Sequence, residues 1–245
     1  MVSFLLAVQF LTTIPVGSKS AVNKKQLKIS LYFYALVGSF IGFILGCIGY
    51  GALFLSQSLA AVMVVICGVL LTGGLHIDGF ADSCDGLYGQ RTIENRLSIM
   101  RDSRIGAMGV MGITCILMFK YVLILNISSV FILPSLICMG AFSRFSLIYA
   151  GYLSQYARKE GKAKFFFNSI GKKALWINGV ITAFLLFICF QIKGLLVLGA
   201  SLIFVTGAIK YVEKKINGMT GDTIGAINEV AEICVLLGCY GIGKF

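Results

Sequence analysis

Charged residues and prolines are scarce in this chain, and each shortage excludes a class of protein. Only 13% of the 245 residues are charged whereas 58% are hydrophobic, a balance that excludes an ordinary soluble globular protein. Pro15 and Pro134 are the only prolines, and no stretch rich in serine or proline divides the chain. We therefore predict one membrane-embedded domain over residues 1–245, an all-α, polytopic integral membrane protein.

Acidic residues are also few, because 10 of them face 21 basic residues, which gives a net charge of +11. In a soluble protein this excess would indicate a nucleic-acid partner. In so apolar a chain it is better explained by basic side chains that anchor loops at the surface of the lipid bilayer. We expect no nucleic-acid partner, whereas anionic substrates remain compatible with the charge.

The apolar residues gather into about seven segments that we predict to be transmembrane helices. They are Leu31–Leu55, Leu59–Thr72, Ala107–Leu125, Val130–Gly151, Ala174–Ile192, Gly194–Lys210 and Ala226–Ile242. Val2–Val16 precedes them and is short for a span, which needs about 20 residues. It predicts an interfacial or re-entrant helix that ends near Pro15, with a short full span as the alternative.

The polar connections between these segments alternate between two kinds. Four long connections hold 17 of the 21 basic residues, and they are residues 17–30, 76–106, 152–173 and 210–222. The short, nearly uncharged turns lie at residues 56–58, at 126–129 and near Lys193. The positive-inside rule therefore predicts that all four long loops face the cytoplasm from the inner membrane of a prokaryote.

One stretch, residues 73–109, holds the only histidine, His76, and five of the ten acidic residues. Its residues Asp78, Asp82 and Asp85 are four and then three positions apart, so on a helix they fall within about 60° of one another. Three like charges on one face repel unless a cation lies among them. Oxygen ligands without a companion cysteine pair favour Mg²⁺ or Mn²⁺ over zinc.

Nearby arginines indicate that the substrate is a phosphate ester. Arg101 and Arg104 flank Asp102 in a segment bounded by glycine, and Arg158 lies in another of the long basic loops. Guanidinium groups bind phosphate oxygens bidentately, and carboxylate-bound Mg²⁺ supplies Lewis acidity for an in-line displacement. We therefore expect Arg101, Arg104 and Arg158 to bind phosphate.

Two residues have both a functional and a structural interpretation. His76 is a candidate general base or proton shuttle, but it lies roughly opposite the Asp78 face of any helix that includes it, which favours a structural role nearly as strongly. Glu229 is a carboxylate inside an apolar span, which is costly and indicates function. The alternative for Glu229 is pairing with a buried lysine or arginine.

Three motifs resemble those of the cobalamin synthase family, in the family's order and over essentially the whole chain: GGLHIDGFADSCDGLYG, RLSIMRDSRIGAMG and GMTGDTIGAINEVAE. Members of that family are integral-membrane adenosylcobinamide-GDP ribazoletransferases. The resemblance implies a Mg²⁺-dependent transferase in which a hydroxyl of alpha-ribazole, or of alpha-ribazole 5'-phosphate, attacks the cobinamide-linked phosphate and expels GMP. The product is adenosylcobalamin or its 5'-phosphate, late in vitamin B12 biosynthesis.

The residue chemistry and the resemblance together give candidate site residues, and the division of roles among the carboxylates is our own inference. The catalytic group would comprise Asp82, His76, Arg104 and Asp102. The metal ligands would be Asp78, Asp82 and Asp85. The substrate-binding group would comprise Arg101, Arg158, Asp222, Asn228 and Glu229. The resemblance leaves open whether the protein associates with other corrinoid-assembly enzymes and whether it forms a homo-oligomer.

Two other functions compete with this interpretation. Membrane phosphotransferases that use a CDP-alcohol also arrange aspartates as D-x-x-D-G, which occurs here from Asp82 to Gly86, but this chain lacks the rest of their pattern. A cation or corrinoid transporter would bind its ion at Glu229 and Glu232 inside the membrane. The place of the acidic cluster in a predicted loop favours an enzyme over that transporter.

Overall fold

A computed structural model of the protein describes residues 2–16 and 23–243. These residues form helices and contain no β-strand, only an isolated bridge between Tyr156 and Met219. The all-α prediction is confirmed, and part of the first basic loop, residues 17–22, lies outside the described residues. The helices are α1 (Val2–Leu11), α2 (Lys24–Ser30), the 3-10 helix η1 (Leu31–Phe33), α3 (Tyr34–Ala52), α4 (Gln57–Thr72), α5 (Leu75–Leu87), α6 (Ile93–Ile99), α7 (Ala107–Asn126), α8 (Ser129–Leu153), α9 (Lys164–Ser169), α10 (Lys172–Ile216) and α11 (Gly221–Ile242).

Five of the described helical segments are long and apolar enough to cross a membrane: Lys24–Ala52, which joins α2 to α3, and α7, α8, α10 and α11. The pair α4 and α5 passes the same test only together, as a segment bent by 91°. Helix α1, with ten residues, is too short to cross the bilayer. It fits the short N-terminal helix that the sequence predicts.

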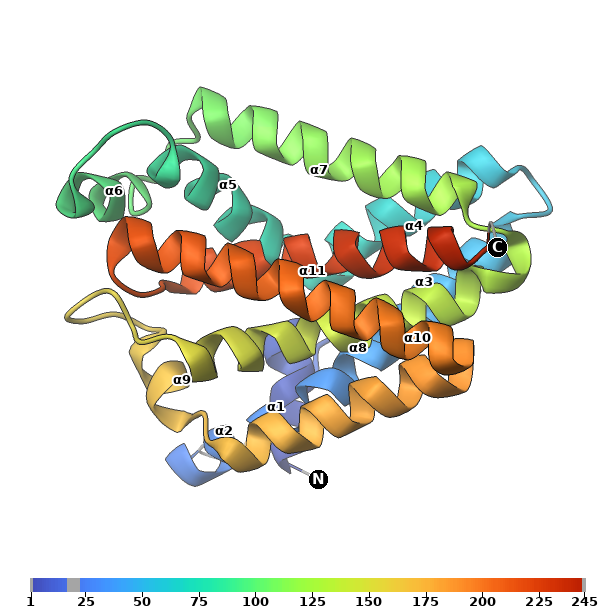
Figure 1. Cartoon of the computed structure of the whole chain (residues 1–245), viewed down its shortest axis with the longest axis horizontal. Coiled ribbons are helices and arrows are strands. Elements are labelled where there is room, and N and C mark those ends of the chain that lie inside the picture. Colours follow the sequence, from blue (N-terminus) through green and yellow to red (C-terminus); the bar gives the residue numbers. More distant parts are fainter. Residues whose placement is uncertain (1, 17–22, 244–245) are drawn as a thin grey trace.

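Helix α10 supplies two crossings. Its 45 residues, at about 1.5 Å each, would extend far beyond a hydrocarbon core about 30 Å thick. The backbone leaves the helical region at Gln191, where φ is 52° and ψ is −134°, and the second arm then runs back toward the end of the molecule at which the first arm begins (Figure 1). The candidate spans number five, or six with the bent pair counted as one; division of α10 into two arms at Gln191 brings this to the seven that the sequence predicts.

Helix α8 forms the centre of the bundle and packs against α3, α10 and α11. Glycines allow the α3–α8 contact to be close, because a Cβ atom on Gly38 would collide with the carbonyl oxygen of Gly140. A Cβ atom on Gly42 would likewise collide with the carbonyl oxygen of Leu136. Small residues commonly mediate such approaches between membrane helices, where packing rather than the hydrophobic effect drives association.

The two kinds of connection lie at opposite ends of the molecule (Figure 1). Helices α6 and α9 and the long polar loops are at one end, on the left of the view. The short turn between α3 and α4, the turn between α7 and α8, and the reversal of α10 are at the other. This separation agrees with the alternation predicted from the sequence.

Two consecutive glycines turn the chain into the acidic helix. Gly73 and Gly74 have φ values of 62° and 67°, in the left-handed region where a side chain is strained. Thr13, just after α1, supports the bend, since its N–H donates to the carbonyl of Leu71 at 2.8 Å and its hydroxyl donates to that of Leu70 at 3.1 Å. Helix α5 leaves this bend to pack against α11 and α7.

Candidate active site

The carboxylates of α5 meet the start of α11. The two helices approach closely at Gly79, where a Cβ atom would lie 2.7 Å from the carbonyl oxygen of Asp222. Asp78 and Asp222 line the same cavity, and the negative charges of both act on Asp82. The structure therefore joins Asp222, which the sequence placed among the substrate ligands, to two of the predicted metal ligands.

Arg158 also belongs to this carboxylate group. Its Nη2 lies 3.1 Å from Oδ2 of Asp222, and its positive charge offsets the carboxylate repulsion at Asp82. Backbone hydrogen bonds hold its loop in place, because the N–H of Ala157 donates to the carbonyl of Met219 at 2.8 Å. The structure thus brings Arg158 to the site as predicted.

Asp85 has a different environment from the other two aspartates of α5. Its two carboxylate oxygens accept hydrogen bonds from the N–H groups of Gly106 (2.8 Å) and Gly109 (2.9 Å), at the N-terminus of α7. It also lies seven residues from Asp78, a separation of about 10 Å along the helix, so one ion cannot contact both side chains. The metal-binding role of Asp78, Asp82 and Asp85 stays a prediction, and the structure adds that the side chains at the two ends of this face, Asp78 and Asp85, have different surroundings.

Among the described residues, no group of three or more His, Cys, Asp or Glu side chains is close enough to hold a metal by itself. Mg²⁺ does not require such a group, since one or two carboxylates usually hold it together with substrate phosphates and water. Only oxygen donors are offered by the side chains of Asp78, Asp82 and Asp222. These three carboxylates outnumber the cation beside them, Arg158. These residues fit a magnesium ion that a phosphorylated substrate would help to bind.

The aspartates of α5 form a row along the helix that we call the acidic row, namely Asp78, Asp82 and Asp85. Asp102 and Arg104 lie at its Asp85 end. Nε and Nη2 of Arg104 donate to the two carboxylate oxygens of Asp102 at 3.0 and 2.7 Å, and these hydrogen bonds lower the pKa of Asp102 to about 2. Both residues, together with Asp85 and Arg91, line an open groove of about 660 Å³. The structure therefore places the predicted catalytic residues Asp102 and Arg104 in a groove that Asp85 lines and Asp82 does not.

Arg101 and Arg96 connect loops at the same end. Nη2 of Arg101 lies 3.5 Å from the carbonyl oxygen of Glu160, so Arg101 is exposed between two loops and is not seated against the carboxylates. Arg96 is buried and donates to the backbone carbonyls that follow the acidic face, those of Gly86, Leu87, Gly89 and Arg91. These bonds satisfy carbonyl groups that the end of a helix leaves free, and they fix the end of α5.

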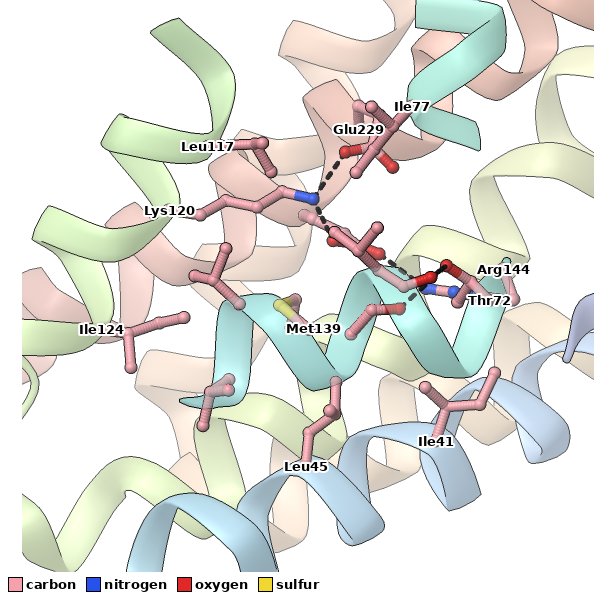
Figure 2. Close-up of a pocket in the computed structure, with 15 residues that line it drawn as sticks. Ile41, Leu45, Thr72, Ile77, Leu117, Lys120, Ile124, Met139, Arg144 and Glu229 are labelled. Atoms are coloured by element: carbon pink, nitrogen blue, oxygen red, sulfur yellow. Dashed lines mark hydrogen bonds and ion pairs between the residues drawn. The ribbon is translucent and has the colours of Figure 1, made fainter. Parts of the chain in front are cut away.

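Glu229 lies in an internal ion-pair network and not at the carboxylate site (Figure 2). Nζ of Lys120 contacts Glu229 at 2.5 Å and Glu232 at 2.6 Å, and Nη1 of Arg144 contacts Glu232 at 2.6 Å. Asn228 donates to both glutamates at 3.2 Å. For Glu229, the structure contains the predicted alternative, pairing with a buried cation, and it places Asn228 in the same network; their substrate-binding roles stay predictions.

His76 lies between the network and the site. Its side chain is 5% exposed, and the charges that act on its ring are those of Lys120, Arg144 and Glu232. Its Nε2 has no hydrogen-bond partner among the described residues. Because His76 also lines the cavity that includes Asp78 and Asp222, its functional and its structural interpretation both stay predictions.

Lys120 and Arg144 were missed by the sequence analysis. Each is the only charged residue in its predicted span, Ala107–Leu125 or Val130–Gly151. A charge inside a span is costly and needs a partner. That signal alone would have indicated that Glu229 and Glu232 are paired inside the bundle.

The chain matches the family model described as Cobalamin-5-phosphate synthase over residues 3–240. Its curated relatives include the adenosylcobinamide-GDP ribazoletransferase of Alkaliphilus metalliredigens, which is 37% identical over 96% of this chain and 93% of the relative. The proteins of the same name from Acetivibrio thermocellus and Clostridium acetobutylicum are 33% and 32% identical, over 96% and 98% of this chain and 96% of each relative. No solved structure matches the chain.

Proposed function

The chain belongs to the cobalamin-5-phosphate synthase family, and we propose that it joins adenosylcobinamide-GDP to alpha-ribazole, or to alpha-ribazole 5'-phosphate, with release of GMP. The enzyme is a membrane-embedded transferase of late cobalamin biosynthesis. The observation that carries the reaction is the meeting of Asp78, Asp82 and Asp222 beside Arg158 at the polar end of the bundle. Such a site suits a transferring phosphate, whose reaction depends on positioning and charge stabilisation.

In this mechanism the ribazole hydroxyl attacks the phosphorus attached to cobinamide. A new P–O bond forms as the P–O bond to GMP breaks. We assign acceptance of the hydroxyl proton to Asp82, because it lies along α5 between Asp78 and Asp85. Arg158 binds phosphate oxygens while its partner Asp222 orients the guanidinium group. When bound by Asp78, Asp82 and Asp222, Mg²⁺, or Mn²⁺ in its place, supplies Lewis acidity.

The site would face the cytoplasm from the inner membrane of a prokaryote. Support comes from the long basic loops, which lie at the same end of the bundle as the acidic row, and from the excess of lysine and arginine in cytoplasmic loops. Adenosylcobinamide-GDP and alpha-ribazole would then reach the site from the compartment in which nucleotides are made.

The experiment that tests the function uses the purified protein in lipid vesicles, supplied with one or both substrates. We expect a corrinoid product, identified by mass spectrometry, that contains the ribazole and appears in equal amount with GMP only when both substrates are present. Turnover of CDP-linked alcohols without reaction of the cobinamide compound would favour the other family of phosphotransferases. Flux of a cation or corrinoid without any GMP would favour a transporter.

A further inference from the structure

A cavity of about 350 Å³ opens beside the acidic row at Asp78. Its walls come from α1, α3, α5, α8, α9 and α11 and include the aromatic rings of Phe10, Tyr34 and Phe166 together with Asp78 and Asp222. This volume falls within the range of about 300–1,000 Å³ that is typical of small-molecule sites. The cavity is therefore large enough for a nucleoside and adjoins carboxylates that the reaction uses.

The aromatic rings of this cavity form a continuous series. Phe10 and Tyr34 have ring centroids 6.1 Å apart with planes inclined by 21°. Tyr34 and Phe166 are also 6.1 Å apart, with planes inclined by 29°. A nearly parallel series of rings offers faces and edges against which a flat heteroaromatic base stacks.

The groove at the other end of the row has the opposite character. It is lined by Arg91 and Arg104, whereas its carboxylates are already engaged. Asp85 accepts from the backbone at the start of α7, and Asp102 accepts from Arg104. Arg104 is engaged by Asp102 in turn, so Arg91, which has no ion-pair partner within the described residues, is the guanidinium group of the groove that is placed to bind a diphosphate.

Charge distinguishes what each cavity would bind. In the aromatic cavity, Asp78 has no ion-pair partner within the described parts of the chain, and Asp222 has only Arg158. Without a bound metal ion, these carboxylates repel a diphosphate, whereas they accept hydrogen bonds from the hydroxyl groups of an uncharged nucleoside. In-line displacement also brings the attacking and leaving groups to opposite sides of the phosphorus, and the two cavities adjoin α5 at Asp78 and Asp85, about 10 Å apart along the helix.

We propose that the aromatic cavity binds the benzimidazole nucleoside that supplies the attacking hydroxyl, and that the arginine-lined groove binds the guanosine diphosphate part of the other substrate. This assignment rests on the proposed function and adds the end of the site at which each substrate enters. Lys162 lines the aromatic cavity and is solvent-exposed, so it is placed to pair with the 5'-phosphate of a phosphorylated nucleoside.

Neighbouring phenylalanines on α9 provide a matched test, because Phe166 lines the cavity and Phe165 does not. Phe166→Leu should raise the KM for alpha-ribazole about tenfold, which corresponds to the loss of one base–aromatic stack, and leave the KM for adenosylcobinamide-GDP unchanged. Calorimetric titration of alpha-ribazole without metal should show the same loss of affinity. Phe165→Leu should change neither constant.

The groove is tested in the same assay. Arg91→Gln should raise the KM for adenosylcobinamide-GDP and leave that for alpha-ribazole unchanged. An exposed variant covers the case in which Phe166→Leu fails to fold: Lys162→Gln should lower the preference for alpha-ribazole 5'-phosphate over alpha-ribazole several-fold, whereas Lys159→Gln, in the same loop, should not.

These outcomes separate the inference from the proposed function. If the wild-type protein releases no GMP, the proposed function fails. If the wild type is active but Phe166→Leu raises only the KM for adenosylcobinamide-GDP, or changes neither KM, the substrate assignment is overturned while the function stands. Unchanged phosphate preference in Lys162→Gln would overturn the role of that lysine.

Discussion

The internal ion-pair network is electrically balanced. Two cations, Lys120 and Arg144, face two anions, Glu229 and Glu232, around a cavity of about 40 Å³. Such a balance makes a set of charges tolerable inside an apolar bundle, because each charge without a partner there costs several kcal/mol. The network joins α7, α8 and α11, and its role is therefore to hold the helices around the site.

Removal of one member should destabilise the protein. Lys120→Met leaves Glu229 without its cation and should cost about 3–5 kcal/mol, which would appear as a lower midpoint of thermal unfolding in detergent. Lys210→Met, which changes an exposed lysine, should unfold at the wild-type temperature. An unchanged midpoint for Lys120→Met would show that the ion pairs do not stabilise the bundle.

The sequence indicated that a carboxylate at Glu229 is costly inside an apolar span, but it did not indicate which residue pairs with it. Lys120 lies 109 residues away from it, and no local pattern connects the two positions. The same limit applies to Asp222, whose approach to Gly79 depends on how α5 packs on α11. Residue types thus indicated where chemistry or pairing was needed, whereas only the tertiary arrangement shows which residues meet.

At the scale of elements, α5 is held at both ends. Gly73 and Gly74 direct it out of α4, and Arg96 binds the carbonyl groups at its end. Asp85 then joins it to α7. The helical spacing predicted the shared face of the aspartates correctly, but the 91° bend was not predicted, because a pair of glycines is compatible with several backbone paths.

Asp85 caps the N-terminus of α7, so its removal should loosen the start of that helix. Asp85→Ala should free the amides of Gly106 and Gly109, and loss of such a cap costs about 1–2 kcal/mol. Hydrogen exchange measured by mass spectrometry should become faster at the start of α7 and stay unchanged in α8. Unchanged exchange combined with loss of all GMP release would instead support Asp85 as a metal ligand.

At the scale of the whole molecule, charge and apolarity determine how the bundle lies in the membrane. The number of crossings and the alternation of loops followed from the sequence, because they depend only on where apolar segments begin and end. The sequence also predicted a short turn near Lys193, where α10 reverses its direction at Gln191. The cavities beside α5 were not foreseen, since they depend on helix packing.

The predicted orientation can be tested by labelling single cysteines in sealed spheroplasts. Ser58→Cys, in the first turn of α4 beside the short connection from α3, should react with a membrane-impermeant maleimide, whereas Glu160→Cys, in the long basic loop, should react only after the membrane is permeabilised. The wild-type protein, which has eight native cysteines, gives the background signal. The reverse pattern would mean that the carboxylate site faces outward.

The most direct test of the central claim is GMP release by reconstituted protein supplied with both substrates, first with Mg²⁺ and then with excess EDTA. The wild-type protein should release GMP with Mg²⁺, stop with EDTA and recover when Mg²⁺ is restored. Asp82→Asn should fold normally but lose about 100-fold or more in rate, because it removes one carboxylate charge at nearly constant shape, whereas Lys24→Gln, in the first basic loop, should match the wild type. Release of GMP by the wild type in EDTA, or nearly full activity in Asp82→Asn, would contradict a metal-assisted transfer at these aspartates.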